Sequence, residues 1–140
     1  EAVFKGAVDP HTPLAHGWLR ASHRKLDPAL STPWRPYHTH DAVEPLVPGE
    51  IVELDIEVWP TCVVVPAGYR VALTVRGKDY EYAGEMAALD FFKNSQLKGV
   101  GIYTHANPRL RPPALYGGTT TLHTGGVHAA HVLLPVIPPR

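Results

Sequence analysis

The sequence of 140 residues predicts an all-β fold, a β-sandwich with one short helix. Two segments with the two-residue hydrophobic period of half-buried strands support this prediction, and turn signals recur at about every dozen residues. A chain of this length is expected to form one domain over residues 1–140 and to bury a core without disulfide bonds.

The clearest strand pattern lies between Pro48 and Arg76. Acidic or other polar residues alternate there with apolar ones, so one face of each strand points inward. Pro48-Gly49 and Pro66-Ala67-Gly68 provide a turn before each strand, because Pro fixes φ and Gly tolerates positive φ. Seven apolar residues are therefore predicted to form the core: Val52, Leu54, Ile56, Val58, Val71, Leu73 and Val75.

Shorter strands are predicted before this region, at Ala2–Val8 and at Gly17–His23. Between them and the main strands, Asp27–Pro48 carries five prolines and predicts a long ordered loop with no helix. Trp34 and Tyr37 are the expected anchors of this loop, since two large aromatic rings can bury much area.

Beyond Arg76, the helical spacing of apolar residues predicts one short helix over Glu85–Leu97. Asn107–Pro113 is rich in turn residues and broken by proline. After it, Thr119–His123 and His131–Ile137 are predicted strands, and the Gly125-Gly126 pair between them indicates a hairpin.

The composition argues against several classes of protein. Basic and acidic residues balance at 13 each, so no charge excess favours nucleic acid or an acidic membrane surface. No apolar run is long enough to cross a membrane. Cys62 is the only cysteine, so it can form no intramolecular disulfide, and an inert buried thiol is expected. The compartment stays open, with a cytoplasmic location favoured.

No catalytic residue is predicted from the motifs. The three serines, Ser22, Ser31 and Ser95, do not stand in the Gly-x-Ser-x-Gly elbow of serine hydrolases. Ser22 and His23 are neighbours, and neighbours on a strand point to opposite faces. The acidic residues Glu53, Asp55 and Glu57 are best interpreted as a solvated strand face rather than as a glycosidase pair.

Nine histidines raise the question of a metal site. One group is His38-x-His40 with Asp41, and a second is His123, His128 and His131. Neither group has the helical spacing of a zinc protease, so solvent-facing or loop-bonded histidines are expected, with no metal and no other cofactor. A sugar platform or an interface could use four aromatic residues: Trp18, Trp34, Tyr37 and Trp59.

Four stretches of the chain resemble a known family. They are HGWLRASHRKLDPALSTPWRPYHTHDAVEPLVPGEIVELDIEVWPT, VPAGYRVALTV, GGTTTLHTGG and HVLLPVIPP. Over Gly6–Pro139, with a looser match at Lys78–Pro112, the sequence resembles the C-terminal domain of cocaine esterase and X-Pro dipeptidyl-peptidase type hydrolases. The resemblance implies a jelly-roll, galactose-binding-like β-sandwich that packs against an α/β-hydrolase domain. The family's catalytic Ser, Asp and His belong to that other domain, and none is carried over here.

The resemblance also implies that the family's sandwich begins several strands before Ala2, so the chain is interpreted as the later part of a jelly roll. An incomplete sheet has an open edge, and a homo-oligomer formed through Ala2–Val8 is expected. The leading hypothesis is a non-catalytic domain of a serine hydrolase, with that hydrolase's catalytic domain as its partner. The alternative hypothesis is a carbohydrate-binding module, and metal-dependent hydrolysis by the histidines ranks third.

Overall fold

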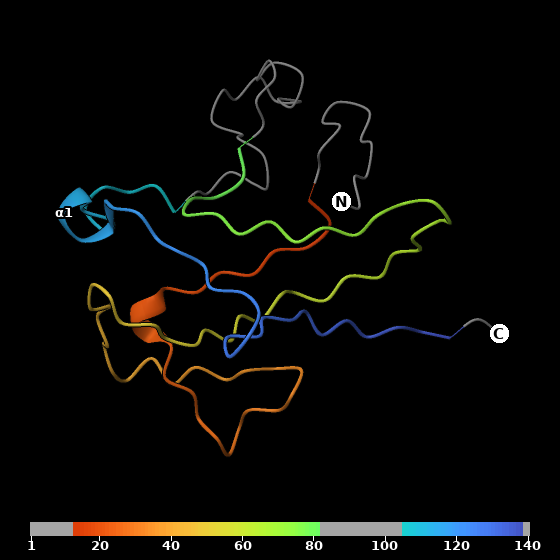
Figure 1. Ribbon diagram of the computed structural model, residues 1–140, viewed down its shortest axis with the longest axis horizontal. Coiled ribbons are helices and arrows are strands. Elements are labelled where there is room, and N and C mark those ends of the chain that lie inside the picture. Colours follow the sequence, from red (N-terminus) through yellow and green to blue (C-terminus); the bar gives the residue numbers. More distant parts are fainter. Residues whose placement is uncertain (1–12, 82–104, 139–140) are drawn as a thin grey trace. The chain divides into compact units, whose positions relative to one another are not determined.

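A computed structural model describes residues 13–81 and 105–138 (Figure 1). They form two compact units, one made of 13–17, 58–81 and 105–117 and the other of 18–57 and 118–138. The helices of the described chain are the 3-10 helix η1 (Ala21–His23) and the α-helix α1 (Pro113–Tyr116). No strand is assigned in these two ranges, so the β-sandwich stays a prediction. The predicted strand Ala2–Val8 and helix Glu85–Leu97 lie outside the described residues.

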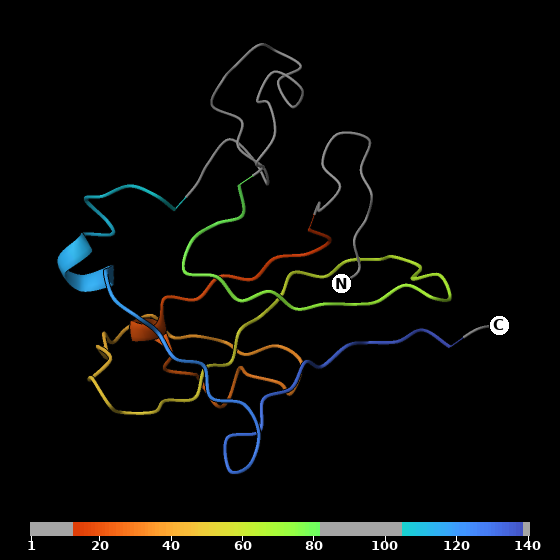
Figure 2. The same ribbon diagram turned by 45° about the horizontal axis from the view of Figure 1, so that its top comes forward.

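In the first unit, the chain turns back at Pro66–Tyr69. The Tyr69 N–H donates to the Pro66 carbonyl at 3.1 Å, and Gly68 has a φ of 86°. A positive φ at the third residue is typical of a type II turn. Figures 1 and 2 show the extended chain running out to this turn and back from it. The turn predicted from Pro66-Ala67-Gly68 is therefore confirmed.

The helix α1 follows a second turn of the first unit. Pro113 occupies its first position, where the N–H that proline lacks would have no helical partner. The Gly117 N–H donates to the Pro113 carbonyl at 2.7 Å and ends the helix. A Cβ at Gly117 would lie 2.5 Å from the Pro113 oxygen, so this close approach requires glycine.

The second unit contains the proline-rich loop. Backbone hydrogen bonds between residues of the loop itself close it. Asp27 N–H donates to the Tyr37 carbonyl at 2.8 Å, and the isolated bridge of Leu26 with His38 continues this antiparallel pairing. At the tip, Thr32 and Arg35 exchange two hydrogen bonds of 3.0 Å. The loop contains no helix, as predicted.

The predicted anchors of this loop are wrong. Trp34 and Tyr37 are exposed rather than buried. Polar groups hold the loop instead: the Asp27 carboxylate accepts the Ala29 N–H at 2.8 Å, and the Ser31 hydroxyl accepts the Tyr37 N–H at 2.9 Å. Because side chains near in sequence satisfy the backbone, the aromatic rings are not needed to fix the loop.

The strand predicted at Gly17–His23 is wrong over its last three residues, which form η1. The His23 N–H donates to the Arg20 carbonyl at 2.7 Å, which closes the 3-10 turn. The Arg24 guanidinium then donates to the Ala21 carbonyl at 3.2 Å and to the Glu44 carbonyl. These local bonds offer the backbone an alternative to a sheet ladder.

Two further turns of the second unit match the glycine signals. The Glu50 N–H donates to the Val47 carbonyl at 3.0 Å, with a φ of 85° at Gly49. Gly125 and His128 exchange hydrogen bonds of 3.0 and 3.1 Å around Gly126, which has a φ of 60°. A positive φ at the first central residue suits a two-residue hairpin turn. The predicted turn is confirmed, and the strands beside it stay a prediction.

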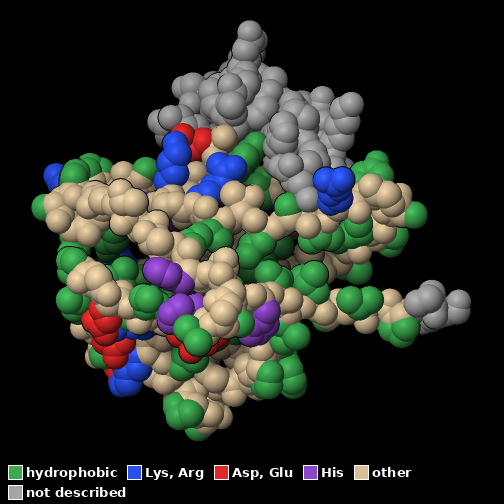
Figure 3. All heavy atoms as spheres, in the orientation of Figure 1, with side chains coloured by type: hydrophobic (Ala, Val, Ile, Leu, Met, Phe, Trp, Pro, Cys, Tyr) green, Lys and Arg blue, Asp and Glu red, His purple; other side chains and the backbone are tan. Residues whose placement is uncertain are grey.

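The predicted core is not found among the described residues, where no apolar side chain is buried. Six of its seven members, all except the half-buried Val52, have exposed fractions between 38% and 62%. Cys62, predicted to be a buried thiol, is also exposed. Within each unit, no described segment packs over these side chains as a second layer. Figure 3 shows hydrophobic side chains spread over the visible face.

Asp27→Ala is expected to loosen the proline-rich loop, because the carboxylate that accepts the Ala29 and Leu30 N–H groups is lost. Loss of such a cap typically costs about 1 kcal/mol, so amide hydrogen exchange at Ala29 should rise by about fivefold. Glu53→Ala serves as the control on an exposed carboxylate and should leave this amide unchanged. Equal effects of the two substitutions would contradict the role of Asp27.

Candidate functional site

The four aromatic residues singled out from the sequence are all exposed: Trp18 by 44%, Trp34 by 72%, Tyr37 by 42% and Trp59 by 67%. Two of them, Trp34 and Tyr37, lie on the same proline-rich loop, which backbone hydrogen bonds between Thr32 and Arg35 and between Asp27 and Tyr37 close. Trp18 lies in the same unit, before η1. Trp59 lies in the first unit, where its N–H donates to the His16 carbonyl at 2.9 Å.

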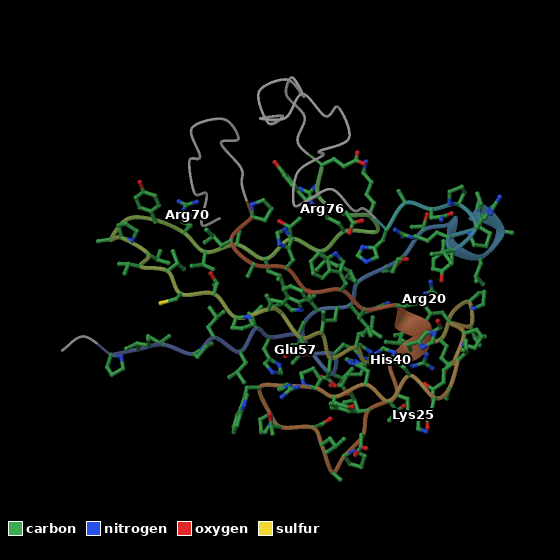
Figure 4. The ribbon with its side chains drawn as sticks, turned by 180° about the vertical axis from the view of Figure 1, so that it is seen from behind. Arg20, Lys25, His40, Glu57, Arg70 and Arg76 are labelled. Carbon is green, nitrogen blue, oxygen red and sulfur yellow. The ribbon has the colours of Figure 1, made fainter. Side chains whose placement is uncertain are left out.

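Three histidines of the second unit form a cluster, hereafter the histidine cluster: His23, His38 and His40. The ring centroids of His23 and His40 are 5.5 Å apart, and those of His38 and His40 are 6.0 Å apart. Figure 4 shows His40 near η1, which carries His23. His40 has a left-handed φ of 54°, a conformation that histidine adopts more often than most residues. The sequence had grouped two of these three residues.

The carboxylate of Asp41, which was considered with His38 and His40 as a metal ligand, is used otherwise. Lys25 Nζ donates to its two oxygens at 2.9 and 3.0 Å, and the Thr39 hydroxyl donates to it as well. The hydrogen bond from Thr39, followed by that from Lys25, lowers the pKa of Asp41. In residues 13–81 and 105–138, no three metal-ligating side chains are arranged to hold an ion.

The second predicted group of histidines is brought together in part. The turn at Gly125 places the His123 and His128 rings with their centroids 5.6 Å apart, edge to face. His131 lies farther along the same segment. A single close pair is fewer than the three protein ligands of a catalytic zinc site or the four of a structural one.

The first unit holds a polar cluster that the sequence analysis missed, hereafter the Asp79 clasp: Gly77, Asp79, His105 and Arg111. Asp79 Oδ1 lies 2.9 Å from His105 Nδ1, and the other carboxylate oxygen accepts the His105 backbone N–H. Arg111 donates to the His105 carbonyl at 3.0 Å and to the Gly77 carbonyl. The Asp79 side chain is only 6% exposed, whereas that of His105 is 65% exposed.

The clasp joins residues that are 26 and 34 positions apart in the sequence. It fixes the chain segment after Thr104 against the segment that follows Arg76. Neither periodicity nor motif spacing relates such distant residues, which is why the sequence analysis missed them. A buried carboxylate whose two oxygens both accept hydrogen bonds is a common structural device, and it orients the imidazole that it binds.

His16 is the other histidine near this carboxylate. Partial burial lowers the pKa of His16, and the negative charge of Asp79 opposes this shift. The neutral imidazole is therefore favoured at this position, because a charged ring would lose part of its hydration.

The serines of the described chain show no activated nucleophile. The Ser31 hydroxyl accepts the Tyr37 N–H and so stabilises the proline-rich loop. Ser22 lies in η1 beside His23, whose buried Nδ1 has no hydrogen-bond partner among the described residues, so the Ser22 hydroxyl does not donate to that nitrogen. Ser95 lies outside the described residues. No helix in the described part of the chain has the length and apolarity that a membrane crossing requires.

Comparisons with known proteins agree with the resemblance read from the sequence. The family model of the X-Pro dipeptidyl-peptidase C-terminal non-catalytic domain matches residues 4–132. Two proteins, from Mycobacterium bovis and Mycobacterium tuberculosis, are each 30% identical to the chain over 145 residues, and their names give serine esterase as a provisional assignment. The alignment covers 98% of this chain but 19% of each relative, so the chain spans about a fifth of their length. No solved structure shows a significant match.

Asp79→Asn is expected to open the clasp, because a neutral amide cannot accept hydrogen bonds with both terminal atoms. Bonds to a buried carboxylate typically contribute about 1.5–3 kcal/mol, so exchange of the His105 amide should accelerate at least tenfold. The matched control is Glu81→Gln, which removes an exposed ion pair with Lys78 at 3.6 Å and should change little. Unaltered protection of His105 in Asp79→Asn would show that the clasp does not hold this segment.

Proposed function

The chain belongs to the family of X-Pro dipeptidyl-peptidase C-terminal non-catalytic domains, and we propose that it serves as the accessory β-sandwich domain of a serine hydrolase. In this proposal the chain supplies structural support and part of the wall of the substrate cleft, while another domain supplies the nucleophile. The names of the two mycobacterial relatives favour an acyl ester as the substrate of that hydrolase, and the family's description favours an X-Pro peptide.

The strongest structural support for the accessory role is the exposure of apolar side chains. The described residues bury no apolar side chain, although 44% of the sequence is hydrophobic. Exposed apolar residues recur along the extended segments of each unit, among them Val64 and Leu73 of the first unit and Ile137 of the second. Large exposed apolar surfaces mark sites of contact with other protein. The catalytic domain of a longer hydrolase is the proposed cover, because most of the relatives' length lies outside the matched region.

Hydrolysis by the chain alone is not expected. The Ser31 hydroxyl is committed to the loop, and the histidine cluster of the same unit has no serine bonded to it in the described structure. A nucleophile needs a base within hydrogen-bond reach.

The purified chain should therefore hydrolyse neither a p-nitrophenyl acyl ester nor a chromogenic X-Pro peptide above the buffer rate. Joined to a catalytic domain with a Gly-x-Ser-x-Gly elbow, it should instead raise that domain's kcat/KM or its thermal stability. Turnover by the isolated chain that disappears in Ser22→Ala or Ser31→Ala would overturn the proposal. Those two variants also control for contaminating esterases, whose activity they would not affect.

We propose further that the chain self-associates when no catalytic domain covers it. Exposed apolar side chains and open backbone groups favour pairing with the nearest compatible chain, and a second copy is always present. Sedimentation velocity should show a species larger than a monomer at micromolar concentration, and Leu73→Glu should shift it towards the monomer. A monomer whose cooperative melt does not depend on concentration would contradict self-association.

A further inference from the structure

Trp34 lies at the tip of the proline-rich loop and is the most exposed of the three tryptophans. It stands inside the turn that Thr32 and Arg35 close with two hydrogen bonds of 3.0 Å. Tyr37 follows on the same loop and is also exposed. The loop therefore presents two aromatic side chains to solvent within four residues, and exposed apolar surface of this kind is typical of binding sites.

The turn that carries this pair is rigid for local reasons. Pro33 and Pro36 flank the Trp34-Arg35 dipeptide and fix φ on both sides of it. The N–H and the carbonyl of Tyr37 are both engaged, the first by the Ser31 hydroxyl at 2.9 Å and the second by the Asp27 N–H at 2.8 Å. A ligand therefore meets aromatic rings on a backbone that is already ordered, which lowers the entropy lost on binding.

Arg35, which follows Trp34 in the turn, forms an ion pair with Glu57. Arg35 Nε is 3.8 Å from Glu57 Oε1, and both side chains are largely exposed, at 64% and 43%. This pair offers hydrogen-bond donors and acceptors to hydroxyl groups, while its charges nearly cancel. A neutral, hydroxyl-rich ligand suits such a surface better than a charged one does.

The size of the surface decides between a small ligand and a protein. Two aromatic side chains offer about 150–250 Å² each, hence at most about 500 Å² together. A stable protein–protein interface needs about 800 Å² from each partner. The turn Thr32–Tyr37, hereafter the aromatic turn, is too small to hold a protein by itself. Its area matches the face of one or two sugar rings.

We propose that the turn Thr32–Tyr37 binds neutral pyranose sugars, with Trp34 as the stacking platform, Tyr37 as a second aromatic contact, and Arg35 and Glu57 as hydrogen-bonding partners of the hydroxyl groups. A β-1,4-linked glucan suits the site, because its equatorial hydroxyls leave flat C–H faces that stack on an aromatic ring. This sugar site goes beyond the proposed function and does not depend on it.

The test titrates the full chain with cellotetraose, xylotetraose and maltotetraose at millimolar concentration. It follows the Trp34 indole N–H of the unsubstituted chain by NMR and measures the affinity of every variant by isothermal titration calorimetry. At least one oligosaccharide should shift this signal saturably, and Trp34→Ala should weaken binding at least tenfold. Tyr37→Phe, which keeps the ring, should bind better than Tyr37→Ala. Trp59→Ala is the matched control on another exposed tryptophan, and sorbitol is the control for hydroxyl groups without a ring.

Three outcomes would overturn the proposal. The first is the absence of a saturable shift with all three oligosaccharides, and the second is equal weakening by Trp34→Ala and Trp59→Ala. The third is a change of sedimentation in Trp34→Ala without any sugar effect, which would make the turn a contact between copies. Failure of the sugar titration would leave the hydrolase proposal intact, because the activity measurements use neither Trp34 nor a sugar.

Discussion

The backbone's need for hydrogen-bond partners shapes the described structure more than hydrophobic burial does. Several turns of the described chain are closed by a short-range backbone bond or by a side chain that accepts a backbone N–H, as Asp27, Ser31 and Asn107 do. Where two distant segments meet, a carboxylate again provides the link, in the Asp79 clasp. Asp, Asn and Ser side chains that accept nearby backbone N–H groups favour turn conformations, so these residues help to determine where the chain turns.

The same constraint explains why the apolar residues are exposed. Turns fixed by local bonds can form without a second layer. The two-residue alternations at Val52–Val58 and Val71–Val75, in contrast, bury apolar side chains only when a second layer covers the apolar face. That cover is absent from the described chain. The match to a non-catalytic domain family, and the fivefold greater length of the relatives, supply a physical reason for such surfaces in the proposed accessory role.

Sequence reasoning succeeded where the signal was local. Gly49, Gly68 and Gly126 have the positive φ that their turn positions predicted, and the proline-rich loop contains no helix. Sequence reasoning failed where the outcome depends on contacts between residues that are far apart in the sequence. Examples are the burial of Leu54 and Leu73, the anchoring of Trp34, and the pairing of Asp79 with His105. Residues 26 positions apart share no period, and alternation identifies an apolar face without saying which segment covers it. Family membership was predictable, because it rests on whole stretches of sequence and not on contacts.

The aromatic turn differs from the rest of the surface because hydrogen bonds within its own loop order it. Every hydrogen bond that orders it, from the pairing of Asp27 with Tyr37 to the exchange between Thr32 and Arg35, joins residues within one loop. Covering the extended apolar segments with another domain or another copy therefore leaves those bonds unchanged. The exposure of the two rings and the exposure of the apolar segments have different physical causes. The rings belong to a loop that local hydrogen bonds keep in place, whereas the apolar segments lack a covering layer. A ligand site on the turn and a support role for the extended segments are thus compatible in one chain.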